Sequence, residues 1–279
     1  MRIEHNIALN FVGGVWLIAM LKSSTELLWL NGAPSTITLL FDVVAMGVVV
    51  FIALSVFISQ KRQQAELQSN ISDAPKRALM LTLALVLALA GDIVNLNLSA
   101  QFYRYGELIK HDYLADSVWF FAPSYMLISL LAASVLRQLS CSIALLFGAA
   151  VISAALGLAS FLTMMLPESG RYILIMTGGY AMIVAIPAAF GLLLLLRCYQ
   201  LRLALPYWLV AGGLVLATVA DALIGQFWLF GNNGAGYFPI IRQLNWLVYF
   251  SSQCLLLQLA LLPSQHHDFI KLTKQAQPT

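Results

Sequence analysis

Hydrophobic residues fill long stretches of the chain, and polar residues gather in the short intervals between them. A bilayer with a hydrocarbon core about 30 Å thick needs about 20 apolar residues per crossing helix. The pattern predicts eight transmembrane helices, at residues 7–30, 35–59, 78–99, 114–136, 141–165, 171–196, 205–230 and 239–262. The expected fold class is therefore all-α, a polytopic membrane helix bundle. Residues 1–262 form a single transmembrane domain, and residues 263–279 form a short cytoplasmic tail.

The composition supports a membrane protein. Of the 279 residues, 61% are hydrophobic and 10% are charged, whereas soluble domains have about 45–50% apolar and about 25% charged residues. The net charge of +3 comes without a basic tract interleaved with aromatic residues, so we expect no nucleic-acid partner. The four histidines lie outside the predicted helices, and the three cysteines are far apart. No metal site is expected from such spacing.

The distribution of basic residues indicates the orientation. If the N-terminus is inside, the inner segments hold ten Lys and Arg residues and the outer loops hold four. The excess of positive charge on the inner side places both termini in the cytoplasm. We expect a multi-pass protein of a cell membrane, the bacterial inner membrane. The polar loop at residues 60–77 is available to a cytoplasmic partner, and nothing in the pattern indicates an oligomeric state.

Four aspartates fall within the outer halves of predicted helices: Asp42, Asp92, Asp116 and Asp221. A charged side chain at the centre of a membrane costs about 2.5–3.5 kcal/mol on insertion scales, and it usually faces a bundle interior or a watery cavity. The four positions predict a polar pocket that opens outward, walled by the second, third, fourth, seventh and eighth helices. A fifth acidic residue, Glu26, is expected to pair with Lys22 four residues earlier, unless Lys22 extends to the membrane surface.

Other polar side chains share helix faces with these aspartates. Asn95 follows Asp92 by three residues, and a polar stripe recurs every four residues at Asn245, Tyr249 and Gln253. We expect them to line the same pocket. The alternative is that they bond neighbouring helices, at about 0.6 kcal/mol each.

Two stretches have a similar layout. In each, an aspartate near the outer end of one helix precedes a tryptophan early in the next, as in Asp92 and Trp119, then Asp221 and Trp246. The layout indicates either an internal repeat of the third and fourth helices in the seventh and eighth, or a chance recurrence. The two tryptophans are candidate pocket walls, although an aromatic belt at the membrane surface accounts for them equally well.

Three short motifs resemble the lysoplasmalogenase (YhhN) family of eight-helix membrane proteins. They are "AGD" ending at Asp92, "VAD" ending at Asp221, and "YFSSQCLL" beginning at Tyr249. The resemblance covers residues 36–262. Where the family tends to have His-x-x-Tyr in its fourth helix, this chain has "DSVW", from Asp116 to Trp119.

The resemblance implies hydrolysis of the vinyl ether bond of a lysolipid, with no metal or organic cofactor. Asp92 and Asp221 are the implied catalytic pair, one as general acid and the other as the carboxylate that activates water, with the two roles unassigned. Arg104 or Arg242 would meet a phosphate at the outer rim. The implied substrate-binding residues are Asp42, Asn95, Arg104, Asp116, Trp119, Arg242, Asn245, Trp246, Tyr249 and Gln253.

A second resemblance competes with the first. The stretch "GDIVNLN…LADSVWFFAPSYMLISLLAA" is similar to the multi-helix membrane input regions that precede diguanylate cyclase domains in bacterial signalling proteins. It implies a free-standing sensory module that binds a ligand without catalysis. A hydrolase predicts Asp92 and Asp221 within reach of one water, with room for an acyl-like chain alongside. A transporter predicts broken helices and polar sites near the midplane, and it is disfavoured because the inner half is apolar.

Overall fold

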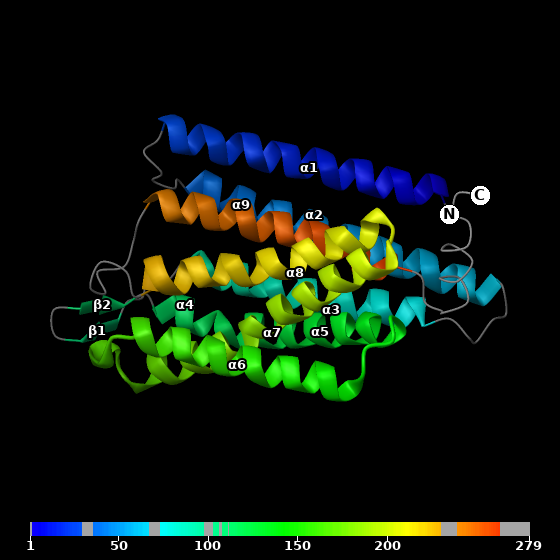
Figure 1. Cartoon of the computed structure of the whole chain (residues 1–279). Coiled ribbons are helices and arrows are strands. Elements are labelled where there is room, and N and C mark those ends of the chain that lie inside the picture. The colour runs from blue at the N-terminus through cyan, green and yellow to red at the C-terminus, as the bar shows by residue number, and fades with distance from the viewer. Residues whose placement is uncertain are drawn as a thin grey trace.

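A computed structural model describes residues 2–29, 36–66, 73–97, 103–105, 108–110, 112–229 and 239–262 (Figure 1). Side chains are described at residues 12–25, 39–66, 73–97, 114–227 and 241–262. The long helices are α1 (Arg2–Trp29), α2 (Thr36–Glu66), α3 (Ala74–Asn95), α5 (Val118–Gln138), α6 (Ile143–Met164), α7 (Arg171–Leu201), α8 (Leu205–Leu223) and α9 (Pro239–Leu256). The shorter elements are β1 (Tyr103–Tyr105), β2 (Leu108–Lys110), α4 (Asp112–Asp116), η1 (Pro167–Ser169), η2 (Ile224–Leu229) and η4 (Leu257–Ala260).

The prediction of an all-α bundle with apolar spans is confirmed. Within the part of the chain that the structure describes, six helical segments are long and apolar enough to cross a membrane: Leu39–Glu66, Ala74–Asn95, Leu114–Gln138, Ile143–Met164, Arg171–Leu201 and Leu205–Phe227. The chain is therefore suited to a multi-pass membrane protein. Helices α1 and α9 occupy the other two predicted positions, but eight crossings, cytoplasmic termini and the identity of the membrane stay predictions.

Helix α2 and the predicted span at residues 114–136 differ from the prediction in ways that bear on the predicted loop and site. Helix α2 continues to Glu66, so the first part of the predicted loop at residues 60–77 is helical. The reason is local, because Gln, Lys, Arg, Ala and Glu are good helix formers even when they are polar. The predicted span at residues 114–136 is divided at Ser117, where α4 ends and α5 begins. Residues 67–72 of the predicted partner loop and the predicted tail at 263–279 lie outside the described residues.

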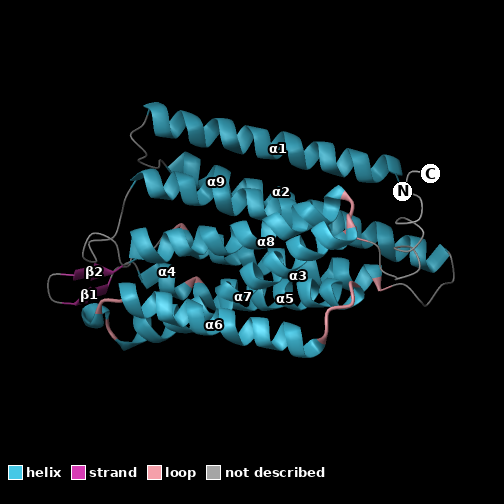
Figure 2. Cartoon of the chain, in the orientation of Figure 1, coloured by secondary structure: helices cyan, strands magenta, loops and turns pink. Residues whose placement is uncertain are grey.

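Strands β1 and β2 pair antiparallel, with Tyr103 opposite Lys110 and Tyr105 opposite Leu108. Figure 2 shows this small hairpin at one end of the bundle, near the end of α3 and the start of α4. The predicted helices at residues 78–99 and 114–136 left residues 100–113 as an outer loop between them. A hairpin there gives the loop backbone hydrogen bonds of its own.

Helices α6, α7, α8 and α9 pack in sequence, and α5 packs against both α3 and α7. Helix α1 lies at one edge of the bundle, against α9 (Figure 1). The interior holds large side chains such as Tyr125, Leu131 and Phe250, whereas large apolar side chains such as Phe147 and Ile175 point outward. An apolar exterior is what a hydrocarbon surrounding requires.

Candidate functional site

A cavity of about 210 Å³ lies within the bundle, near the beginning of α2 and the ends of α3 and α8. It is lined by Leu39, Asp42, Val43, Asp92, Asn95, Leu96, Asn97, Phe121, Ala220, Asp221, Ile224, Arg242, Asn245, Trp246 and Tyr249. We call it the polar cavity, because three carboxylates and a guanidinium belong to its wall. The structure thus brings together candidate residues that are up to 207 positions apart in the sequence, from Asp42 to Tyr249.

Asp221 is held by two phenols. It lies in the last turn of α8, and the hydroxyl groups of Tyr125 on α5 and Tyr180 on α7 each donate a hydrogen bond to it. The Tyr180 bond measures 2.7 Å to Oδ1, while Tyr125 donates to Oδ2. The chain then continues into a turn of π-helix, Ile224–Leu229, and such turns are frequent at functional sites. Both oxygens of Asp221 are fixed by neutral donors.

Asp92 has one phenol donor. It lies near the end of α3, and the Tyr249 hydroxyl on α9 donates to its Oδ2 at 2.9 Å. Among the side chains that the structure describes, no donor reaches Oδ1 of Asp92. Asp92 lies within electrostatic range of both Asp42 and Asp221. The two carboxylates of the proposed catalytic pair therefore belong to one cavity and one electrostatic environment.

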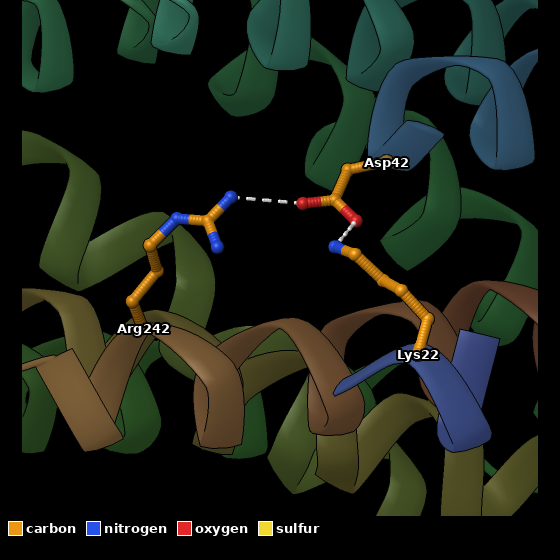
Figure 3. Close-up of polar contacts among 3 residues, drawn as sticks. All are labelled: Lys22, Asp42 and Arg242. Atoms are coloured by element: carbon orange, nitrogen blue, oxygen red, sulfur yellow. Dashed lines mark hydrogen bonds and ion pairs between the residues drawn. The ribbon is translucent and has the colours of Figure 1, made fainter. Parts of the chain in front are cut away.

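Asp42 differs from these two because it is paired with cations. The Lys22 ammonium on α1 lies 2.5 Å from Oδ1, and a terminal nitrogen of Arg242 on α9 lies 2.9 Å from Oδ2. Figure 3 shows the Asp42 carboxylate between them, with the side chains arriving from three helices. The prediction that Lys22 pairs with Glu26 or extends to the surface left out this ion pair. The side chain of Glu26 lies outside the described residues.

Aromatic and amide side chains also line the polar cavity, together with aliphatic ones. The ring of Tyr249 meets those of Phe121 and Trp246, at centroid distances of 6.1 and 5.9 Å. The Asn245 amide donates to the Ala220 carbonyl at 2.6 Å, which joins α9 to α8. The Trp246 indole N–H is buried without a hydrogen-bond partner among the described residues. An unpaired buried polar group is costly, so this donor is available to a bound molecule.

Asp116 and Trp119 do not line the polar cavity. The Tyr172 hydroxyl donates to Asp116, and the Trp119 indole, which is 64% exposed, donates to that same hydroxyl at 3.2 Å. Helix geometry explains this, because Trp119 and Phe121 are two residues apart and so lie on nearly opposite faces of α5, and Phe121 faces the cavity. The structure therefore leaves the two tryptophans of the predicted repeat in different surroundings, Trp119 exposed and Trp246 buried.

Gln253 also lies outside the polar cavity. Gln253 is buried one helical turn beyond Tyr249, where its amide nitrogen lies 3.3 Å from the Ser252 hydroxyl. Arg104 belongs to β1, and its side chain lies outside the described residues. Within the described chain, no three His, Cys, Asp or Glu side chains are grouped to hold a metal.

A second cavity, of about 290 Å³, adjoins the first. Both cavities have Asn95, Phe121, Asp221 and Ile224 in their walls. The rest of the second wall comes mainly from α5, α6, α7 and α8 and is largely apolar, so we call it the apolar cavity. Asp221 therefore stands at the boundary between a polar and an apolar compartment.

Sequence reasoning missed Lys22, Tyr125 and Tyr180 as partners of the aspartates. Each sits in an apolar stretch where a lone phenol or ammonium gives no sign of its partner. The signal that could have found the two tyrosines is their predicted depth in the membrane, which is similar to that of the aspartates.

Comparisons of the chain with protein-family models, with curated proteins and with solved structures find no match. The geometry of the two cavities and their polar groups is thus the basis on which a function is assigned.

Proposed function

We propose that the protein is a metal-independent membrane hydrolase that cleaves the vinyl ether bond of a single-chain lipid in its outward-facing polar cavity. The observation that carries the proposal is the placement of Asp92 and Asp221 on one cavity, each fixed by tyrosine hydroxyl groups from other helices. Pairs of carboxylates in unlike surroundings are how proteins divide acid and base roles. The lysoplasmalogenase resemblance points to the same chemistry.

The hydrogen bonds divide the two roles. Asp221 accepts from two phenols, and donors stabilise the ionised form of a carboxylate. We assign it as the base that activates water. Asp92 accepts from one phenol and has Oδ1 without a donor among the described side chains, which leaves that oxygen to carry a transferable proton. We assign Asp92 as the general acid.

The proposed reaction conserves atoms and charge at each step. Asp92 gives its proton to the outer carbon of the C=C–O unit, and an oxocarbenium ion forms at the carbon attached to oxygen. Water adds to that carbon while its proton passes to Asp221, which gives a hemiacetal. As the hemiacetal collapses, its hydroxyl proton passes through water to the glycerol oxygen and the bond between carbon and that oxygen breaks. The products are a fatty aldehyde and a glycerophosphodiester with a free hydroxyl group. Proton transfer from Asp221 to Asp92 through water in the cavity restores both groups.

Ligand binding without catalysis is the second candidate function. The observation that favours it is that both oxygens of Asp221 are already occupied by phenols, as they are in a fixed recognition site. In this alternative the protein is a sensory module of the bacterial inner membrane, and the region at residues 60–77 meets a cytoplasmic partner.

The deciding experiment measures aldehyde release from a 1-alkenyl lysophospholipid by purified protein in nanodiscs. Asp92→Asn and Asp221→Asn are each expected to lower the rate by about 10²–10⁴-fold, the usual contribution of an acid or base. Asp116→Asn is the matched control, since Asp116 also accepts from a tyrosine but lies outside the polar cavity. No release by folded wild-type protein, or equal losses in all three variants, overturns the hydrolase in favour of binding alone.

A further inference from the structure

The apolar cavity has a wall suited to hydrocarbon. Its apolar side chains include Leu114, Val118, Leu156, Phe161, Met164, Val184 and Ile224. Three hydroxyl groups in the wall donate to the protein's own carbonyls: Ser117 to Leu114 at 2.8 Å, Thr177 to Ile173 at 2.6 Å, and Thr218 to Val184 at 2.6 Å. A hydroxyl satisfied in this way has no donor left for a ligand. The wall therefore offers mainly van der Waals contact.

The mouth of the apolar cavity lies on the outside of the bundle. Three of its lining residues are exposed. Leu156, which is 65% exposed, and Ser160 lie on α6, and Ala222 lies on α8. Helices α6 and α8 both pack against α7, which contributes Tyr180 and Val184 to the cavity wall. All three residues belong to segments that are apolar enough to cross a membrane. An opening at this position faces acyl chains rather than water.

The inner end of the apolar cavity meets the polar one. Asn95, Phe121, Asp221 and Ile224 line both cavities. A linear molecule with one polar end can therefore place that end near Asp92 and Asp221 while its chain occupies the apolar cavity.

We propose that the apolar cavity is the binding site for the single hydrocarbon chain of the substrate, and that the chain enters from the bilayer between α6 and α8. This inference rests on the proposed function in one respect, the placement of the substrate's polar end in the polar cavity. The chain site itself is defined by the apolar wall, the satisfied hydroxyl groups and the mouth on the lipid-facing surface.

The test uses a saturated 1-O-alkyl lysophospholipid with a diazirine in its chain, which the proposed reaction cannot cleave. Wild-type protein in nanodiscs is photolysed with this probe, and the crosslinked residues are mapped by mass spectrometry. Crosslinks are expected within residues 156–164 and 177–185, and an unlabelled alkyl lysophospholipid should displace them. A diacyl phospholipid at the same concentration should not, which separates the substrate chain from bulk lipid.

Ser160→Trp fills the mouth and is expected to lower the displaceable crosslinks by about tenfold or more, since overpacking opposes entry of the chain. Ala155→Trp is the matched control, because Ala155 is exposed on the same helix but does not line the apolar cavity. Crosslinks spread over the exposed face of α6 and not displaced by the competitor overturn the chain site, even if aldehyde is released. Equal loss in both variants overturns the assigned mouth. Displaceable cavity crosslinks without aldehyde release keep the chain site and remove only the reaction.

Discussion

Asp42 should be the cavity aspartate whose loss most weakens the fold. Its carboxylate is 2.5 Å from the Lys22 ammonium and 2.9 Å from the Arg242 guanidinium, and the three side chains are 9, 14 and 7% exposed. Asp42→Asn keeps the size of the side chain but removes the anion. Two buried cations are then left facing a neutral amide whose NH₂ group points a donor at one of them.

The expected magnitude follows from burial and from the number of ion pairs that each substitution removes. Removing one partner of a buried charge pair costs about 3–5 kcal/mol, because the remaining charge is uncompensated. Lys22→Met removes one of the two cations and leaves the ion pair between Asp42 and Arg242. Asp42 then loses one hydrogen bond from a charged group, so the expected loss of unfolding free energy is about 1.5–3 kcal/mol. The exposed pair between Asp73 and Lys76, at 3.4 Å, is the control. Asp73→Asn should cost about 0–1 kcal/mol.

Equilibrium unfolding by SDS in mixed micelles, followed by far-UV circular dichroism, measures these differences. The free energy of unfolding is expected to fall in the order Asp73→Asn, Lys22→Met, Asp42→Asn, with the last variant the least stable. The ion pair between Lys22 and Asp42 joins α1 to α2, so the destabilisation should appear first as release of α1 from the bundle. An Asp42→Asn variant as stable as Lys22→Met, or as stable as wild type, refutes the reasoning.

Three other predictions concern the site and the packing. Tyr180→Phe removes one hydrogen-bond donor from Asp221 and should slow aldehyde release by about 10- to 100-fold, since a hydrogen bond to a charged group contributes about 1.5–3 kcal/mol. Tyr172→Phe, which lies outside the polar cavity, should leave the rate unchanged. Equal losses of rate in the two variants would contradict the assignment. Gly157→Ala should destabilise the fold by about 1–3 kcal/mol, because an added Cβ would lie 2.2 Å from a backbone oxygen of α7. Gly148→Ala, on the same helix with open space around it, should instead gain about 0.5–1 kcal/mol in the SDS titration. Arg77→Gln should cost about 1–3 kcal/mol in that titration, because the buried guanidinium donates to a carbonyl beyond η4; an unchanged midpoint would contradict this.

The positions of the helices were predictable because hydrophobic length is a property of the chain alone. A run of about 20 apolar residues needs a helix to satisfy its backbone in a membrane. What the run does not encode is a local break such as the one at Ser117, since "LADSVWFF" has no proline or glycine to mark it. Nor does it encode which face of the helix meets the cavity, which here is that of Phe121 rather than Trp119.

The polar partners were not predictable for a different reason. The depth of Asp42, Asp92 and Asp221 follows from helix rise, which is a local quantity. The choice of partner depends on how the helices rotate against one another, which one sequence does not contain. Lys22 illustrates this, because the local rule pairs it with a residue four positions away while the structure places its ammonium on another helix, at Asp42.

The three carboxylates of the polar cavity differ in how their charge is compensated. Asp42 is paired with two cations, which is sufficient reason for an aspartate there: the triad joins α1, α2 and α9. Asp92 and Asp221 accept hydrogen bonds only from phenols among the described side chains, so no cation is paired with them. If the task of Asp92 were only to join helices, the carbonyl oxygen of an asparagine would accept its one phenol hydrogen bond without the cost of burying a charge. At Asp221 an asparagine has one acceptor oxygen for two phenols, so one phenol would face the NH₂ group. An acid or base must be able to gain and lose a proton, which asparagine cannot do. That Asp92 and Asp221 have phenols rather than cations as their described partners therefore favours a chemical role over a structural one. It predicts that Asp92→Asn folds as well as wild type in the SDS titration while losing aldehyde release.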